Sequence, residues 1–312
     1  MRWALAAPMF LLAAWAQPAA DKSAADKPAD PSALESSGKP MAPKFQCTEE
    51  DIQSFGLGCT EDEPCPIYLE LSAFETVGNQ IFAVGNIHSA ANTLYSIVLA
   101  SSDSGKTWRE PFERVRGASL DRILFSGFEN GWITGQVVNP LARDPFLLIT
   151  SDGGKTWRRQ PIFSESRAGS IQQIWFDSRT TGSLIFDGGQ SGEGLRYELY
   201  ESATGGDNWM VREASDQPLR IKRMPPAPEN ADWRLHADAA SKSNRLEKRQ
   251  GASWRPLASF AVNIGSCKPP PVKEPEPPPE TETQTTTAPP AATGTLSLPA
   301  LRGEQPAKRP KK

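Results

Sequence analysis

The sequence predicts an all-β fold made of repeated antiparallel sheets, and three observations lead to this prediction. Short runs that alternate apolar and polar residues recur between turn residues. A motif of eight residues rich in Ser, Asp, Gly, Thr and Trp recurs along the middle of the chain. No stretch shows sustained helical periodicity. Alternation with a period of two is typical of strands, whereas amphipathic helices space their apolar residues by three or four.

The repeated motif, called here the box segment, sets the number of sheets. It reads SSDSGKTW at 101–108, TSDGGKTW at 150–157, more weakly SATGGDNW at 202–209, and ends faintly in GASW at 251–254. The closing tryptophans, Trp108, Trp157, Trp209 and Trp254, lie 45 to 52 residues apart. Periods of this length are typical of four-stranded propeller blades. We therefore predict a small β-propeller of four blades, each with four antiparallel strands.

Within a repeat, the predicted order is strand, turn, strand, loop, strand, box segment, strand. The first repeat is expected over 68–111, with middle strands at 80–84 and 94–100, and the fourth over 218–262. The second and third repeats share an apolar pattern before the box, which ends at Gly131-Trp132-Ile133 and Gly182-Ser183-Leu184. This shared pattern predicts equivalent strand pairs in successive repeats.

The box segments have a structural interpretation. Their Asp can accept hydrogen bonds from backbone N–H groups of a tight turn, their second Gly can adopt a positive φ, and their Trp can bury a large ring. The predicted structural residues are Ser101, Asp103, Gly105, Thr107, Trp108, Thr150, Asp152, Gly154, Thr156, Trp157, Gly206, Trp209, Gly251 and Trp254. The alternative, that Asp103 and Asp152 are paired catalytic carboxylates, is disfavoured because equivalent turns of successive blades hold them far apart. The third and fourth boxes carry Thr204 and Arg249 in place of Asp, so looser turns are expected there.

The box segments resemble the Asp box, Ser-x-Asp-x-Gly-x-Thr-Trp, of the bacterial neuraminidase repeat (BNR) family. In that family the box is the turn between the third and fourth strands of a propeller blade. With the phrase Gly131-Trp132-Ile133-Thr134-Gly135, the boxes are also similar to exported propellers related to the photosystem II assembly factor. These relatives act as non-catalytic docking platforms. The resemblance therefore implies an exported protein-binding scaffold.

Composition divides the chain into four segments. Residues 1–16 hold Arg2 and an apolar run that ends in small residues, which predicts a signal peptide, with a retained anchor as the alternative. Residues 17–44 are predicted as a disordered linker, 45–267 as the propeller, and 268–312 as a Pro-rich disordered tail. A bacterial periplasmic or secreted protein is expected, with no transmembrane helix in the mature chain, because the apolar run is shorter than the roughly 20 residues that a span needs.

The four cysteines, an even number in a chain predicted to be exported, are disulfide candidates. Cys65 precedes the first predicted strand and Cys267 follows the last, so the hypothesis is a Cys65–Cys267 bridge with Cys47–Cys59, and a Cys59–Cys65 pair is the alternative. A metal site is disfavoured because no Cys-x-x-Cys pair or histidine cluster accompanies the cysteines. No metal and no cofactor are predicted.

Loops after the second and fourth strands of every blade are expected at one end of the sheets, opposite the box turns. The candidate binding residues in these loops are His88, Arg114, Arg116, Arg143, Arg167 and Arg196. Loops on a rigid scaffold often bind ligands, although ordinary solvated loop charges are the alternative. A net charge of −3 gives no field that would attract nucleic acid.

The predicted function is a non-catalytic protein-binding or assembly scaffold in the cell envelope, with another envelope or secreted protein as partner. The alternative is a glycan-binding protein or a glycoside hydrolase related to sialidases. Such an enzyme would need a tyrosine nucleophile with a glutamate partner, but Tyr197 and Glu198 are neighbours in a predicted strand, so their side chains point apart. In a third hypothesis, the Pro-rich tail is presented to a partner.

Overall fold

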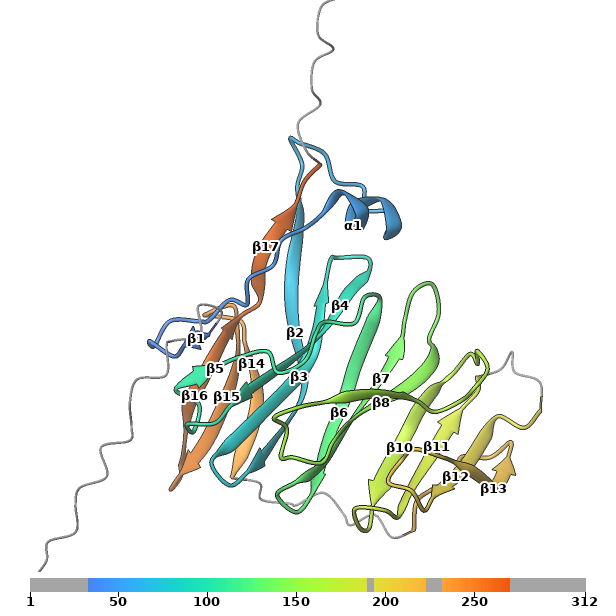
Figure 1. Ribbon diagram of the computed structural model, residues 1–312. Helices are drawn as coiled ribbons and strands as arrows, with labels where there is room; N and C mark the ends of the chain where they lie inside the picture. Colours follow the sequence, from blue (N-terminus) through green and yellow to red (C-terminus); the bar gives the residue numbers. More distant parts are fainter. Residues whose placement is uncertain (1–32, 190–193, 223–231, 270–312) are drawn as a thin grey trace, which may run out of the picture. The chain divides into compact units, whose positions relative to one another are not determined.

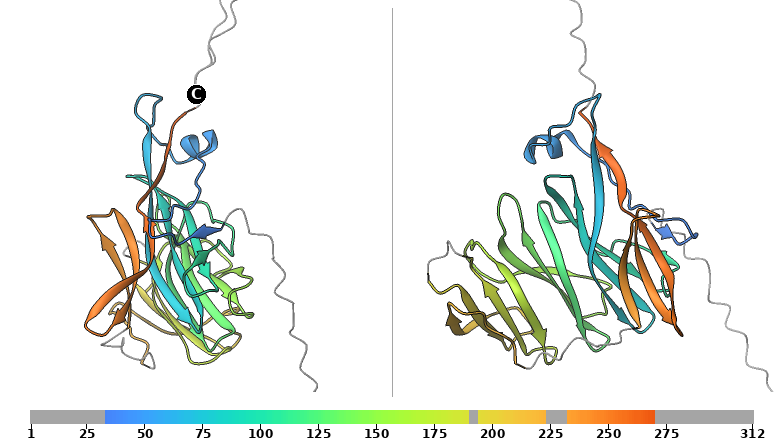
Figure 2. Two further views of the ribbon diagram at one scale, coloured as in Figure 1. Left: turned by 90° about the vertical axis from the view of Figure 1, so that its left-hand side faces the viewer. Right: turned by 180° about the vertical axis from the view of Figure 1, so that it is seen from behind.

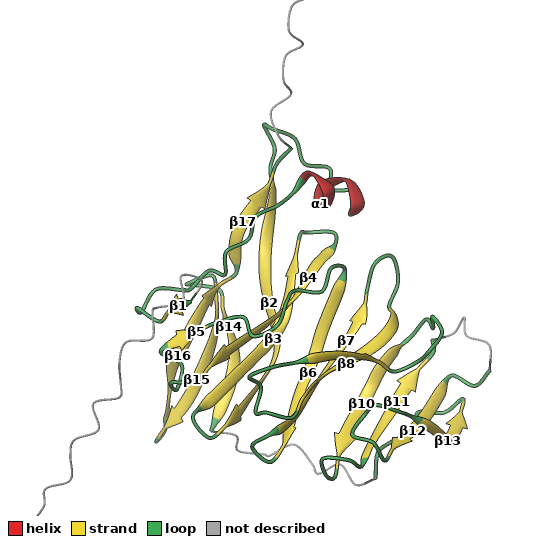
Figure 3. Ribbon diagram, in the orientation of Figure 1, coloured by secondary structure: helices red, strands yellow, loops and turns green. Residues whose placement is uncertain are grey.

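The structure is a computed structural model, and it describes residues 33–189, 194–222 and 232–269. The predicted signal peptide, and the tail from residue 270 onward, lie outside the described residues. The chain divides into two units, Met1–Pro271 and Val272–Lys312, of which the second also lies outside them. The described part consists of antiparallel sheets that lie side by side, as Figures 1 and 3 show, and the predicted all-β propeller class is confirmed.

Four sheets, numbered here by repeat, make up the propeller. In hydrogen-bonded order, sheet 1 is β17 (Asn263–Cys267), β2 (Cys65–Val77), β3 (Gln80–His88) and β4 (Thr93–Ser101). Sheet 2 is β6 (Ala118–Ser126), β7 (Asn130–Val137), β8 (Arg143–Thr150) and β9 (Arg158–Pro161). Sheet 3 is β10 (Ser170–Phe176), β11 (Gly182–Asp187), β12 (Tyr197–Ser202) and β13 (Met210–Ser215). Sheet 4 is β14 (Trp233–Asp238), β15 (Ser243–Gln250) and β16 (Ser253–Ala261).

Sheets 2 and 3 have the predicted strand order, whereas sheets 1 and 4 differ in detail. In the first repeat the fourth strand is only β5 (Thr107–Trp108), at the end of the box, and it pairs with β1 (Leu34–Glu35). Strand β17 follows the fourth repeat but pairs with β2, and thus links the end of the propeller chain to the first sheet. Sheet 4 has three strands within the described ranges. The exchange of strands between repeats depends on pairing between distant residues, which local alternation does not encode.

Residues 33–44, which the sequence assigns to the linker, have defined structure. Besides β1, this segment contains Met41, which is 6% exposed. The Met41 N–H donates to the Ser259 carbonyl at 2.7 Å, and its own carbonyl accepts from the Ala261 N–H at 2.8 Å. The assignment of residues 33–44 to a disordered linker is therefore wrong. It relied on a composition rich in Pro and Lys and overlooked the few apolar residues that anchor the segment on the sheets.

A short helix, α1 (Glu49–Ser54), was not predicted. Thr48 caps it: the Thr48 hydroxyl accepts from the Asp51 N–H at 3.1 Å, and the Asp51 carboxylate accepts from the Thr48 N–H at 2.9 Å. This reciprocal pair is a capping box, which satisfies N–H groups that have no partner within the helix. Six residues are too few for the periodicity by which helices are recognised in a sequence.

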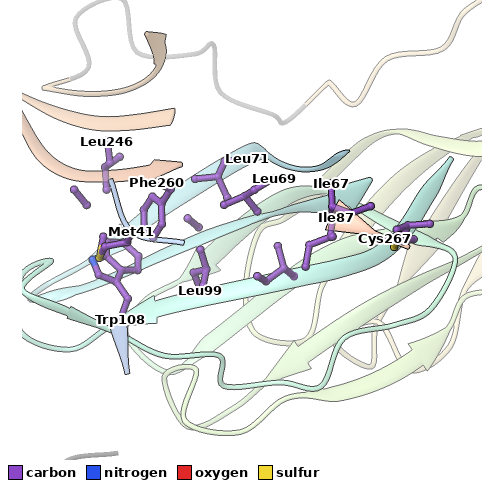
Figure 4. Close-up of a cluster of buried hydrophobic side chains, with 14 of the residues drawn as sticks. Met41, Ile67, Leu69, Leu71, Ile87, Leu99, Trp108, Leu246, Phe260 and Cys267 are labelled. Carbon is purple, nitrogen blue, oxygen red and sulfur yellow. The ribbon is translucent and has the colours of Figure 1, made fainter. Parts of the chain in front are cut away.

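Three clusters of buried side chains lie between neighbouring sheets and put them in the order 4, 1, 2, 3. Between sheets 4 and 1, the Trp108 ring lies 5.1 Å from the Phe260 ring, centroid to centroid, and Figure 4 shows both beside Met41 and Leu246. The second cluster packs sheet 1 on sheet 2, and the third packs sheet 2 on sheet 3. Figure 2 shows the sheets from two further sides. Burial between sheets is what stabilises each blade on the next.

The two disulfides are Cys47–Cys267 and Cys59–Cys65. The hypothesis of Cys65–Cys267 with Cys47–Cys59 is wrong, and the alternative Cys59–Cys65 pair is present. Cys65 and Cys267 do face each other across β2 and β17, as expected. However, the Thr60 N–H donates to the Glu63 carbonyl at 3.0 Å, and this tight turn brings Cys59 back to Cys65. Cys267 is then left to bond Cys47.

Candidate functional site

The first two box segments form the expected turns. Asp103 accepts from the backbone N–H of Lys106 at 3.0 Å and of Thr107 at 2.9 Å, and from the Thr107 hydroxyl at 2.7 Å. Asp152 accepts the same three bonds in the second box. Trp108 is buried, and its indole N–H donates to the Gly105 carbonyl at 3.0 Å. Both carboxylates are therefore occupied by their own turns.

The two weaker boxes behave differently from each other. In the third, the Thr204 hydroxyl accepts from the Asn208 N–H at 2.9 Å, so a threonine takes over part of the role of the missing Asp. In the fourth, Arg249 replaces the Asp, and the guanidiniums of Arg234 and Arg249 lie 4.4 and 5.0 Å from the centroid of the half-buried Trp254 ring. The fourth tryptophan thus stacks on cations instead of lying beneath a closed turn.

The second box makes a testable contribution to acid stability. Burial raises the pKa of Asp152, but hydrogen bonds from the Thr156 hydroxyl and N–H, from Thr150 and from the Lys155 N–H outweigh it and lower the pKa to about 2. An Asp whose pKa is depressed in the folded state stabilises the fold above its unfolded pKa of about 3.9, and this stabilisation is lost as pH falls toward the folded value. We expect the melting temperature of the native protein to fall between about pH 4 and pH 2 more steeply than that of Asp152→Asn, measured by circular dichroism. Parallel curves for the two proteins would contradict the expectation.

The predicted binding residues lie at the loop end of the sheets, but most of their charges are already paired. The ion pairs are Arg114–Glu110 at 2.6 Å, Arg116–Glu50 at 2.6 Å, Arg143–Asp144 at 3.9 Å, Arg167–Glu198 at 2.9 Å and Arg196–Asp187 at 2.9 Å. His88 Nδ1 lies 2.8 Å from the Ser89 carbonyl oxygen, and its ring packs on Tyr68. Only Arg143 is loosely held, so these residues mainly fasten loops.

Arg116 fastens α1 to sheet 1. Its guanidinium lies 3.2 Å from the carboxylate of Asp51, which is 1% exposed and also accepts from the Tyr95 hydroxyl at 2.6 Å. Burial and this hydrogen bond raise the pKa of Tyr95 to about 12. A buried carboxylate with a cation and a phenol as donors is a satisfied structural group.

Arg167 fastens the loop after β9 to sheet 3. It donates to Glu198 at 2.9 Å and to the Tyr200 hydroxyl at 2.7 Å, and its guanidinium lies between the Phe163 and Phe186 rings, 4.5 and 4.7 Å from their centroids. Tyr197, which was weighed beside Glu198 and set aside because neighbouring side chains point apart, is not its partner, and Tyr200 was not considered. Residues two apart on a strand share a face, so the pattern Glu-x-Tyr could have revealed this pair.

The Arg167 cluster combines a tyrosine, a glutamate and an arginine. Burial and the hydrogen bond that the phenol donates to Glu198 raise the pKa of Tyr200 to about 12. A phenol with this pKa is protonated near neutral pH, and its proton is directed at the Glu198 carboxylate. Arg167 is bonded to both groups, so the cluster holds the loop after β9 against sheet 3.

A different feature, the free edge of β13, is the candidate functional site. Its first residues, Met210 and Val211, are 67% and 58% exposed. On one side β13 pairs with β12, and on the other side no strand of the described chain pairs with it. The N-terminal segment covers two other edges, since β1 pairs with β5 and Met41 bonds to β16, whereas β9 of sheet 2 also ends its sheet without a second partner in the described chain. We call residues 210–215 the β13 edge.

Two further observations concern metals and membranes. Within the described ranges, no three side chains of His, Cys, Asp and Glu come together in a way that could hold a metal ion. The same part of the chain contains no helix that is long and apolar enough to cross a membrane.

The similarity of the chain to known proteins is limited to solved structures. No protein-family model matches the chain, and no curated protein matches it. Among solved structures, YCF48 bound to a D1 peptide is 19% identical with a TM-score of 0.36, over 62% of this chain and 54% of that one. A GH74 xyloglucanase from Xanthomonas campestris is 15% identical with a TM-score of 0.32, over 43% of this chain and 18% of that one. The chain thus spans about half the length of the first and about a fifth of the second.

Proposed function

We propose that this chain is an exported, non-catalytic scaffold that binds an extended segment of another envelope or secreted protein along the β13 edge. The observation that carries the proposal is the exposure of Met210 and Val211 on an outer strand whose second edge has no partner in the described chain. An unpaired edge of this kind presents N–H and C=O groups to which an added strand can bond.

The molecule itself supplies an example of strand addition. Strand β1 lies antiparallel to β5 with Leu34 opposite Trp108, and the Ser36 N–H donates to the Lys106 carbonyl at 2.8 Å. β13 directly follows the third box segment, and β5 forms the last two residues of the first. A partner segment could add to sheet 3 in the same way, with its main chain on the β13 edge. Met210 and Val211 point to opposite faces of the sheet, so successive apolar side chains of the partner would pack on one or the other.

Export and family membership belong to the same proposal. Two disulfides and no free cysteine in the described residues fit an oxidising compartment such as the periplasm or the extracellular space. The apolar run at 1–16 would direct the chain there as a signal peptide. The hydrogen bonds of the first two box turns support a place in the BNR family.

The glycoside hydrolase alternative finds less support. The box carboxylates Asp103 and Asp152 are engaged in their turns, and Tyr200 is held protonated against Glu198. Glycosidic bond cleavage in most such enzymes requires two available carboxyl groups, or a tyrosine nucleophile in sialidases. The tyrosine–glutamate pair in the described residues, Tyr200 with Glu198, is bonded on both groups to Arg167, which leaves neither of them free.

The proposal is tested with peptides selected for binding to the purified protein from a random display library. The double substitution Met210→Lys and Val211→Lys is expected to weaken their binding at least ~10-fold, since it places charges on the edge without touching the core. Phe128→Lys and Leu141→Lys, which change residues exposed by 74% and 71% outside β13, are the matched controls. Binding is measured by fluorescence anisotropy.

Strand addition also has a signature in the peptide. Methylation of its backbone nitrogens should abolish binding only at every second residue, because alternate N–H groups of an added strand face the edge. Selected peptides that bind equally to the double variant would contradict the proposal. So would a dimer in sedimentation that the double substitution dissociates, because the β13 edge would then join two copies of this chain.

A further inference from the structure

A cavity of about 460 Å³, open to the surface, lies at the junction of sheets 1 and 4, apart from the β13 edge. It is bounded by the turn between β14 and β15 and by the link between β16 and β17. These two segments are joined by a hydrogen bond of 2.9 Å from the Val262 N–H to the Lys242 carbonyl. The volume falls in the range of about 300 to 1,000 Å³ that is typical of small-molecule sites.

Most of the cavity wall is apolar. Ala237, Ala239, Val262 and the ring of Tyr68 line it. The Tyr68 ring is supported from behind by the His88 ring, with 5.6 Å between the centroids. Such a wall favours a ligand with an apolar body, because burying apolar surface contributes roughly 25 cal/mol per Å².

The acceptor groups at the cavity are already satisfied. Asp238 accepts from the Ser241 hydroxyl at 2.6 Å and from the Ala240 N–H at 3.2 Å, and it forms an ion pair of 2.6 Å with Arg245. The Ser243 hydroxyl lies 2.6 Å from that of Ser241. A cationic ligand would therefore find no free carboxylate among these lining residues.

Donor groups, in contrast, remain available. The Lys242 ammonium has no hydrogen-bond or ion-pair partner in the described part of the chain. The Asn263 side-chain oxygen accepts from the Gly265 N–H at 3.2 Å, which leaves its NH₂ group free to donate. Lys242 also has a φ of 49°, a left-handed backbone that residues other than glycine seldom adopt and that tends to occur at ligand sites.

We propose that this cavity binds a monocarboxylate with an apolar body. The carboxylate is held by the Lys242 ammonium and the Asn263 NH₂ group, and the body packs against Val262 and the Tyr68 ring. A small aliphatic or aromatic acid and the C-terminal residue of a peptide share this chemistry. The site stands independently of the β13 edge.

The test uses 3-phenylpropanoate and its uncharged counterpart 3-phenylpropanamide, titrated into the full-length protein by calorimetry. The acid is expected to bind at least ~10-fold more tightly than the amide, because a charge-assisted hydrogen bond is about twice as strong as a neutral one. Lys242→Asn should remove this difference and leave the amide affinity unchanged. Asparagine tolerates a left-handed backbone, so this variant keeps the turn.

The matched control is Lys155→Asn, which removes the same charge from an exposed lysine of the second box. It should leave the affinity for the acid unchanged. Ala239→Leu narrows the cavity and should weaken the acid and the amide alike. Equal affinity for acid and amide, or a Lys242→Asn variant that binds the acid as the native protein does, would overturn the proposal.

Two further arms separate the sources of the carboxylate and the two proposals. N-acetyl-Ala-Ala-Phe with a free C-terminus, if bound more tightly than 3-phenylpropanoate and lost on C-terminal amidation, identifies a peptide end as the ligand, and the reverse order identifies a free acid. The double substitution Met210→Lys and Val211→Lys should not change the affinity for the acid. A negative result for the cavity therefore leaves the strand-addition proposal intact, and a negative result for strand addition leaves the cavity proposal intact.

Discussion

Removal of the Cys47–Cys267 bridge, by Cys47→Ala with Cys267→Ala, is expected to lower the free energy of unfolding by about 5 kcal/mol. The two cysteines are 220 residues apart, so the bridge restricts nearly the whole propeller chain in the unfolded state. In the folded state it ties the segment before α1 to β17, the strand that joins the end of the propeller to β2. Urea denaturation followed by tryptophan fluorescence measures the loss.

The second disulfide is the matched control for this prediction. Cys59 and Cys65 are only 6 residues apart, and the same chain-entropy argument gives about 2 kcal/mol for their removal by Cys59→Ala with Cys65→Ala. The difference between the two double variants is therefore the informative quantity. Equal losses would mean that the Cys47–Cys267 bridge does not act by restricting the unfolded chain.

Local patterns in the sequence were sufficient for the fold class. The boxes at 101–108 and 150–157 mark tight turns because their Asp, Gly and Thr satisfy one another within eight residues, and the structure has these bonds. Alternation located the middle strands of the first repeat, although β3 runs on to His88 beyond the predicted end at residue 84. Such features depend on neighbours in the sequence, and so they can be predicted from it.

The features that were missed depend on residues far apart in the chain. β17 leaves the fourth repeat to pair with β2, and residues 33–44 find their partners on β5 and β16. The candidate site shows the same limit. Arg116 looked like a free loop charge because its partners Glu50 and Asp51 belong to a helix about 65 residues earlier. Likewise, the β13 edge is exposed because no other strand of the described chain pairs with it on that side. The pattern within one repeat does not show which strands of other segments cover an edge.

Trp132→Ala is expected to destabilise the fold by about 3 to 5 kcal/mol, which is typical of removing a large buried aromatic side chain. Trp132 is 1% exposed, and its ring stacks on that of Phe176 with 3.8 Å between the centroids. Its indole N–H donates to the Gly205 carbonyl, at 2.8 Å, in the third box. The Trp132 side chain of sheet 2 thus contacts both β10, through Phe176, and the third box turn, through Gly205.

Trp132→Phe separates the two contributions, because it keeps an aromatic ring against Phe176 and removes the N–H that the Gly205 carbonyl accepts. We expect it to cost less than the alanine variant, with a loss of at least about 1 kcal/mol for the unsatisfied carbonyl. Phe128→Ala, at an exposed turn, should change the free energy of unfolding by no more than about 0.5 kcal/mol. If Trp132→Ala proved as mild as Phe128→Ala in urea denaturation, sheets 2 and 3 could not be packed through this tryptophan. The packing of sheet 3 on sheet 2, and with it the stacking of successive repeats, would then need a different explanation.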